Sequence, residues 1–165
     1  AQGTPRERRE TLHALLGVLA QRLAKRLCSK CKKAYHPADN EICHLLDEYC
    51  EDLQQTASFQ DDPVRAREDI LAGWRTRYAD DSGKFTLYEA VGCEHCTGGY
   101  KGRLGLHELM VGTDQVKRLI QERARVATLL SAALDEGMRT LRQDGIEKVM
   151  VGITDLKQVR KVCIR

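Results

Sequence analysis

The sequence predicts a mainly α-helical protein with a few short β-strands, organised around four cysteines. Most apolar residues recur at spacings of three and four, which is typical of helices. Two Cys-x-x-Cys pairs, Cys28–Cys31 and Cys93–Cys96, lie far apart in the chain, and β-prone runs flank the second pair. Such pairs supply the four thiolates of a closed tetrahedral zinc site. We therefore expect a four-cysteine zinc-knuckle element with an inserted helical hairpin, and a C-terminal helical subdomain.

The composition is that of a soluble globular protein. With 165 residues, 42% apolar and 31% charged, the chain makes one ordinary domain or two small ones. Apolar runs are too short to cross a bilayer, and the first ten residues are too charged for a signal peptide. Seven cysteines is an odd number, which does not suit a secreted disulfide scaffold. We expect reduced thiols and a cytoplasmic location.

The small net charge of +3 hides a strong segregation of charge along the chain. Residues 1–36 carry nine Lys/Arg and two Asp/Glu, or +7; residues 37–96 carry five and fourteen, or −9; residues 97–165 carry thirteen and eight, or +5. This pattern argues against a nucleic-acid partner, which needs one basic face. It suits docking on a charged protein, although solvated charges without a partner would give the same pattern.

The elements before the second cysteine pair are predicted to be helical. Residues 10–27 have leucines at helical spacing and positive charge at the end of the segment. Within residues 37–84, one helix begins near Pro37 and Asn40. A second begins at Asp62-Pro63, as N-cap and first helical residue, and ends at a turn at residues 80–83. Cys43 and Cys50 are seven residues apart on the first of these helices and are expected in the core.

The C-terminal third is predicted to begin with a strand at residues 103–111, followed by helices. A helix capped by Thr113 or Asp114 comes first, then a helix over 126–143 that Gly145 ends. A short helix over 146–150 stops at Gly152, and Thr154 caps the last helix.

The zinc interpretation rests on the spacing within each cysteine pair. Two cysteines three residues apart in a tight turn direct both sulfurs to one point, and two such turns complete a tetrahedron. The 61 residues between Cys31 and Cys93 require the tertiary structure to bring the turns together. A thiol–disulfide role, or substitution of one cysteine by His36, His44 or His95, stays open. Four thiolates leave no position for a substrate, which favours a structural site over a zinc hydrolase.

No convincing active site is visible in the sequence. It contains no phosphate-binding GxxxxGK[ST] and no Ser/His/Asp arrangement, and its histidines are dispersed. The chain alone is therefore expected not to be catalytic. A free-standing zinc-ribbon module that binds nucleic acid or acts as a chaperone-type domain is the alternative from another class.

Three blocks resemble the type II secretion and type IV pilus assembly ATPases (the GspE/PilB family). They are Val18–Cys31, with the sequence VLAQRLAKRLCSKC; Gly92–Leu109, with GCEHCTGGYKGRLGLHEL; and Asp135–Val149, with DEGMRTLRQDGIEKV, continuing to Thr154. Residues 37–84 are longer than the interval expected between the two knuckles. The resemblance divides the chain into residues 1–27, a helix from the end of the ATPase core; residues 28–96, the zinc-binding element; and residues 97–165, the strand and helical subdomain.

The resemblance also implies a function. It identifies a C-terminal region of a cytoplasmic hexameric ATPase, peripheral to the bacterial inner membrane, whose P-loop lies outside this sequence. ATP and Mg²⁺ would bind the full-length parent only, and Arg22 is a candidate contact for the nucleotide because a guanidinium suits phosphate geometry. The implied partners are neighbouring subunits and an inner-membrane platform protein, with no nucleic acid.

Overall fold

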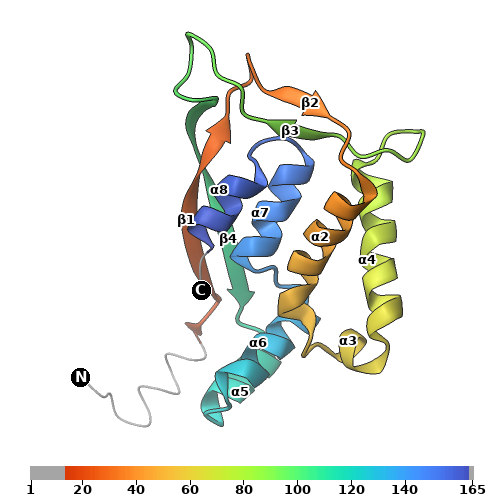
Figure 1. Ribbon diagram of the computed structural model, residues 1–165. Coiled ribbons are helices and arrows are strands. Elements are labelled where there is room, and N and C mark those ends of the chain that lie inside the picture. Colours follow the sequence, from red (N-terminus) through yellow and green to blue (C-terminus); the bar gives the residue numbers. More distant parts are fainter. Residues whose placement is uncertain (1–13, 164–165) are drawn as a thin grey trace.

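A computed structural model describes residues 14–163 and shows a chain of helices and a few strands (Figure 1). The strands are β1 (Gly17–Leu27), β2 (Lys33–Tyr35), β3 (Leu87–Glu89) and β4 (Tyr100–Val111). The helices are α2 (Asp39–Cys50), α3 (Ala57–Asp61), α4 (Pro63–Tyr78), α5 (Asp114–Gln121), α6 (Val126–Asp135), α7 (Leu141–Met150) and α8 (Leu156–Val162). A 3₁₀ turn, η1 (Glu51–Leu53), follows α2. The predicted class, mainly helical with a few strands, is confirmed.

The strands form two separate antiparallel pairs. β1 pairs with β4 over almost its whole length, from Gly17 opposite Val111 to Leu27 opposite Tyr100. β2 pairs with β3, with Ala34 opposite Tyr88. Because residues directly opposite each other share a face, Leu19, Leu23, Leu109 and Val111 lie on one face of the β1–β4 ribbon.

The molecule is layered (Figure 1). Helices α7 and α8 lie between the β1–β4 ribbon and the pair α2 and α4, while α5 and α6 lie at the end opposite β2 and β3. The buried core joins the outer helices to the central ones, since one cluster contains Leu46 and Trp74 together with Ile146 and Val159. Tyr49 packs edge-on against Trp74, with ring centroids 5.3 Å apart and planes at 86°.

The prediction of a helix over residues 10–27 is wrong. Residues 10–13 lie outside the described residues, Ala14 is helical, and residues 17–27 form β1. Leu19 and Leu23 are four residues apart, and a spacing of four also places side chains on one face of a strand. Leu27 follows a register shift after Lys25 and is buried. The long partner β4, distant in sequence, satisfies the backbone of this segment and decides the outcome.

The helix boundaries after β4 also differ from the prediction in three places. Residues 126–143 are not one helix: α6 ends at Asp135, Gly137 takes a φ of +95°, and Thr140 begins α7. Gly145 lies inside α7 instead of ending a helix. The last helix is capped by Asp155, whose carboxylate accepts from Gln158 N at 3.0 Å, and not by Thr154.

Several predicted boundaries are confirmed. Asp62 caps α4 with Pro63 as its first residue, and its carboxylate accepts from Arg65 N at 3.0 Å. Thr113 caps α5. The turn at residues 80–83 closes through Asp80, which accepts from the backbone of Ser82 and of Lys84. Cys50 is buried as expected, but Cys43 is exposed, since it lies on the outer flank of α2.

Candidate metal centre

Each cysteine pair lies in a tight turn that joins a long strand to a short one. β1 runs directly into Cys28, where Lys32 N donates to Cys28 O at 2.9 Å and Cys31 N donates to the same oxygen at 3.3 Å. The second turn lies between β3 and β4, and Cys96 N donates to Cys93 O at 3.2 Å. In both turns the N–H of the second cysteine donates to the carbonyl oxygen of the first, which closes the turn and brings the two sulfurs of the pair together.

Strand pairing on both sides brings the two turns together. The first turn lies between β1 and β2, the second between β3 and β4, and both strand pairs are antiparallel. A backbone hydrogen bond of 2.8 Å from Cys28 N to Gly99 O joins the turns directly. Most of the 61 residues between Cys31 and Cys93 form an excursion that leaves the junction after His36 and returns at Phe85. The two ends of this excursion are in contact, since His36 Nδ1 lies 3.0 Å from Phe85 O.

The four sulfurs converge. All four Sγ atoms lie within 4.8 Å of one another. Cys28 Sγ lies 4.0 Å from Cys93 Sγ, Cys31 Sγ lies 3.6 Å from Cys96 Sγ, and Cys93 Sγ lies 3.7 Å from Cys96 Sγ. A regular tetrahedron with Zn–S bonds of about 2.3 Å has S···S edges of about 3.8 Å. The geometry and the chemistry of the donor set therefore fit one zinc ion held by thiolates.

The thiols of the site differ in acidity. Burial raises the pKa of Cys96, but hydrogen bonds from the backbone of Cys93 and Gly99 and from the Cys31 thiol outweigh this effect and hold it at about 7. Burial raises the pKa of Cys31 to about 12, against the lowering effect of a hydrogen bond from the Gly92 backbone. Cys93 N donates to Cys96 Sγ at 3.3 Å, which is the contact expected for a thiolate acceptor.

The histidines considered as substitute ligands lie elsewhere. Within residues 14–163, the group that could hold a metal contains four cysteines and no histidine. His36 contacts Phe85 O, and His95 lies 3.5 Å from Glu94 at the exposed end of its turn. The spatial grouping matches the four residues that the sequence indicated.

A second feature of the site was not predicted: the loop between α7 and α8 fastens to the first cysteine turn. Lys32 Nζ donates to Gly152 O at 2.7 Å and lies 4.1 Å from the centre of the Tyr88 ring. Leu27 N donates to Ile153 O at 2.9 Å, and buried Thr154 donates to Lys25 O at 2.8 Å. The sequence marked this loop through Gly152, whose φ of +70° follows the end of α7, and through Thr154, which was predicted as a helix cap and not as a contact of β1.

Arg22, the candidate nucleotide contact, is exposed on β1. It lies opposite Leu106, so it projects from the ribbon face that carries α7 and α8.

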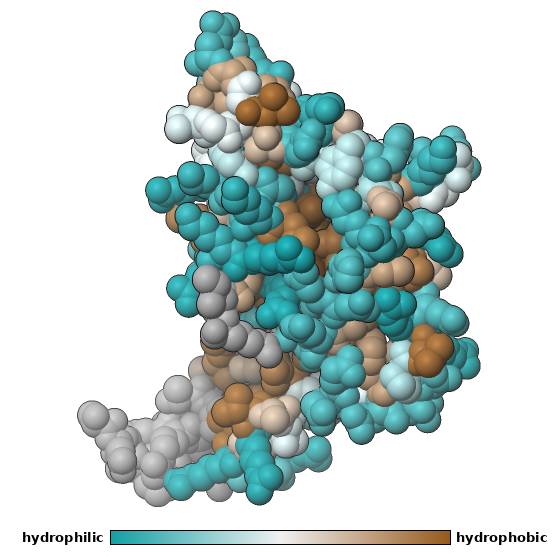
Figure 2. Space-filling model, in the orientation of Figure 1, coloured by the Kyte–Doolittle hydropathy of each residue, from teal (hydrophilic) through white to brown (hydrophobic). Residues whose placement is uncertain are grey.

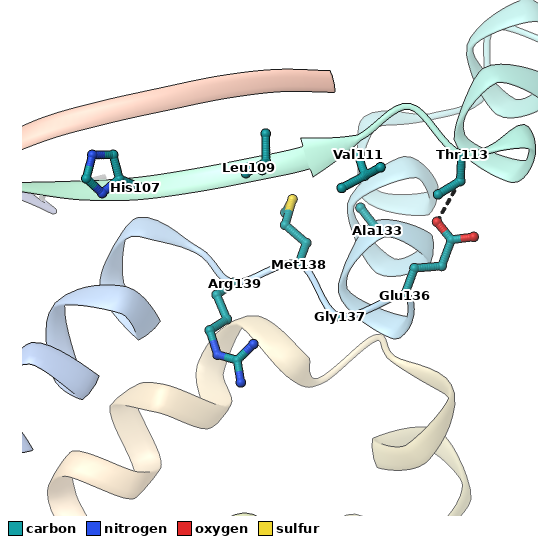
Figure 3. A pocket seen from close by; sticks show the side chains of 9 residues that line it. All are labelled: His107, Leu109, Val111, Thr113, Ala133, Glu136, Gly137, Met138 and Arg139. Carbon is teal, nitrogen blue, oxygen red and sulfur yellow. Dashed lines mark hydrogen bonds between the residues drawn. The ribbon is translucent and has the colours of Figure 1, made fainter. Parts of the chain in front are cut away.

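A cavity of about 280 Å³ lies where β4 ends (Figure 3). His107, Leu109 and Val111 of β4 form one wall, and Met138 reaches toward them from the loop after α6. Thr113 donates to Glu136 at 2.7 Å at one end of the cavity, whereas Arg139 points away and donates to Glu147. None of the predicted site residues lines this cavity.

Comparison with known proteins decides the family. Residues 6–161 match the sequence model of the family described as Type II/IV secretion system protein. The chain belongs to this family. It is 33% identical over 145 residues to the type IV pilus assembly ATPase PilB of Pseudomonas aeruginosa, covering 88% of this chain and 20% of the relative.

Other members of the Type II/IV secretion family give the same result. PilB of Myxococcus xanthus is 37% identical over 143 residues, covering 86% of this chain and 20% of the relative. The type II secretion system ATPase E of Vibrio cholerae is 33% identical over 154 residues, covering 90% and 23%. The chain thus spans about a fifth of the length of these relatives.

Proposed function

We propose that this chain is the zinc-stabilised C-terminal part of a hexameric ATPase that powers type II protein secretion or type IV pilus assembly. The observation that carries the zinc assignment is the convergence of the Sγ atoms of Cys28, Cys31, Cys93 and Cys96 within 4.8 Å. Family membership supports the parent function, and the match over residues 6–161 disfavours a free-standing zinc-ribbon module.

The proposed role of the metal is mechanical. A bound zinc ion would add four bonds between two chain segments that the two strand pairs and the Cys28–Gly99 hydrogen bond hold side by side. Lys32 extends the connection to Gly152, and Leu27 and Thr154 extend it to the start of α8. The site would therefore hold β1, β4 and the C-terminal helices as one rigid unit, suited to transmitting movement.

One face of the β1–β4 ribbon is suited to packing against the rest of the protein. Leu19, Leu23, Leu109 and Val111 are each at least half exposed on this face. Figure 2 shows hydrophobic surface at the end of the molecule where β4 leads into α5. Exposed apolar surface of this kind marks an interaction site. Because the relatives are about five times longer, we assign this face and the cavity beneath Leu109 to contact with the remainder of the ATPase.

The remaining assignments follow from the family. ATP and Mg²⁺ would bind the full-length parent, in its cytoplasmic location at the inner membrane, with neighbouring subunits and the membrane platform as partners and no nucleic acid. Within the described residues, none of the helices has the length and apolar character that a membrane span requires.

Arg22 would contact nucleotide phosphate from β1, and Arg22→Ala in the full-length ATPase should weaken ATP binding. Unchanged ATP affinity and turnover would contradict this role.

Zinc content tests the central proposal. Metal-replete protein, dialysed against a weak chelator, should retain about one zinc per chain by atomic absorption, with sulfur-only ligation in X-ray absorption spectra. Cys31→Ser and Cys96→Ser should each lose most of this zinc, whereas Cys43→Ser, which alters an exposed cysteine, should retain it. Zinc-free protein after replete purification would overturn the proposal.

A further inference from the structure

A groove lies on the helices of residues 37–84, between the two cysteine turns in the sequence. It has a volume of about 560 Å³ and runs between the end of α2, α3 and the start of α4. This groove lies toward the end of the molecule opposite β2 and β3, away from the candidate metal centre (Figure 1). Its lining combines apolar side chains with three carboxylates.

Part of the groove lining is apolar. Phe59, Pro63 and Val64 form this part, and Val64 is 67% exposed although it belongs to the first turn of a helix. Phe59 is buried in the main core cluster, so this wall is fixed by the interior of the protein. An apolar side chain of a partner would bury Val64 without moving the helices.

The groove also carries negative charge. Asp47, Glu51 and Glu68 line it together with Arg67, and Arg142 of α7 pairs with Glu51, so Glu68 is the lining carboxylate with no partner among the described contacts. The Arg67 guanidinium is held by Asp47 through two hydrogen bonds of 2.8 and 3.2 Å, which raise its pKa, so it neutralises that carboxylate. The C-terminal end of α2 adds the negative end of a helix dipole. Residues 37–84 as a whole carry five Lys/Arg and twelve Asp/Glu, or −7.

We propose that this groove binds a basic amphipathic segment of the inner-membrane platform protein. The inference rests on the proposed function, which supplies a membrane partner. Membrane proteins carry an excess of Lys and Arg in the segments next to their cytoplasmic helix ends. Such a segment, with one apolar residue against Val64 and a cation opposite Glu68, complements the groove in both charge and polarity.

Two substitutions in the full-length zinc-loaded ATPase test this inference. Glu68→Lys reverses one charge of the groove. Glu68 is chosen because its carboxylate has no ion-pair partner among the described contacts, whereas Glu51 pairs with Arg142. Val64→Ser removes the apolar contact in the first turn of α4. The matched controls are Glu122→Lys, at the end of α5, and Val126→Ser, in the first turn of α6, where the valine is also exposed.

The measurement is the Kd for the isolated cytoplasmic part of the platform protein of the same system. Glu68→Lys should weaken binding about tenfold or more and reduce its salt dependence, and Val64→Ser should weaken it several-fold. Both controls should bind like the unaltered protein, and all variants should retain zinc and basal ATP hydrolysis.

Three results would overturn the inference. In the first, the unaltered ATPase does not bind the platform part. In the second, both groove variants bind it normally. In the third, the groove variants impair hexamer assembly instead, which would make a neighbouring copy of the ATPase the occupant of the groove. Normal binding by the variants would leave platform docking itself intact at another surface. Failure of the proposed function is recognised separately, by absence of zinc.

Discussion

Two glycines inside helices have opposite surroundings. A Cβ atom at Gly145 of α7 would lie 2.6 Å from Val159 Cγ1 and 3.2 Å from Leu106 Cδ1. At Gly73 of α4, the nearest atom is the guanidinium of Arg77, 3.7 Å away. Gly145 therefore lets α8 and the β1–β4 ribbon approach α7 closely, whereas Gly73 adds only backbone freedom to α4.

Alanine at these two positions should change stability in opposite directions. Gly145→Ala should lower the free energy of unfolding by about 1–3 kcal/mol, because the methyl group overpacks a buried contact. Gly73→Ala should raise it by about 0.5–1 kcal/mol, because alanine loses less entropy on forming a helix. Urea denaturation of the zinc-loaded chain measures both. Equal effects at the two positions would contradict the close packing at Gly145.

The residues of the candidate site could be identified from the sequence because their signal is local. Cys28 and Cys31 share one turn, as do Cys93 and Cys96, and the type of side chain indicates the ligand. The fastening of Lys32 to Gly152 could not be identified in this way. It joins residues 120 positions apart, and nothing in either local sequence marks the contact.

At the scale of elements, the segment now seen as β1 shows where pattern reasoning fails. Leu19, Leu23 and Leu27 fit a helix and a strand equally, because four is both about one helical turn and two strand repeats. The decision comes from pairing with β4, more than seventy residues later by the register of Leu27 with Tyr100. The strand β4 was predicted correctly, because its own residues alternate between apolar and other side chains over residues 103–107.

The break between α6 and α7 was, in contrast, visible in the sequence. Thr140 accepts from Gln143 N, and the Gln143 side chain accepts from Thr140 N at 3.0 Å, forming a capping box. The S/T-x-x-E/Q pattern and the preceding Gly137 both mark a helix boundary. Helical periodicity across residues 126–143 concealed these signals, because two consecutive helices on one core can keep a common apolar phase.

At the scale of the molecule, residues 37–84 are an integral part of the core. They contribute eight of the thirteen buried residues of the main cluster in the described chain, including Leu46 and Trp74. Polar contacts extend the junction: Tyr49 donates to Glu147 at 2.9 Å, Thr140 donates to Asp52 at 2.8 Å, and Glu48 pairs with Arg160. The C-terminal helices are thus packed against the ribbon on one side and the inserted helices on the other.

Removal of the inserted helices should leave the metal site intact but destabilise α7. Residues 37–84 can be replaced by a short glycine linker, because His36 and Phe85 already lie in contact. We expect this variant to retain zinc, since the cysteines and the β2–β3 pair remain.

Its α7 amides, in contrast, should exchange far faster, because Ile146 and Val149 lose their apolar neighbours on α2. Hydrogen–deuterium exchange, read at Ile146–Met150 with and without zinc, measures the effect. Trp74→Ala in the intact chain supplies a second variant, expected to lower the free energy of unfolding by about 3–5 kcal/mol through a core cavity. If α7 stayed fully protected in the deletion variant, the inserted helices would be a passive addition, and the ribbon alone would hold the C-terminal helices in place.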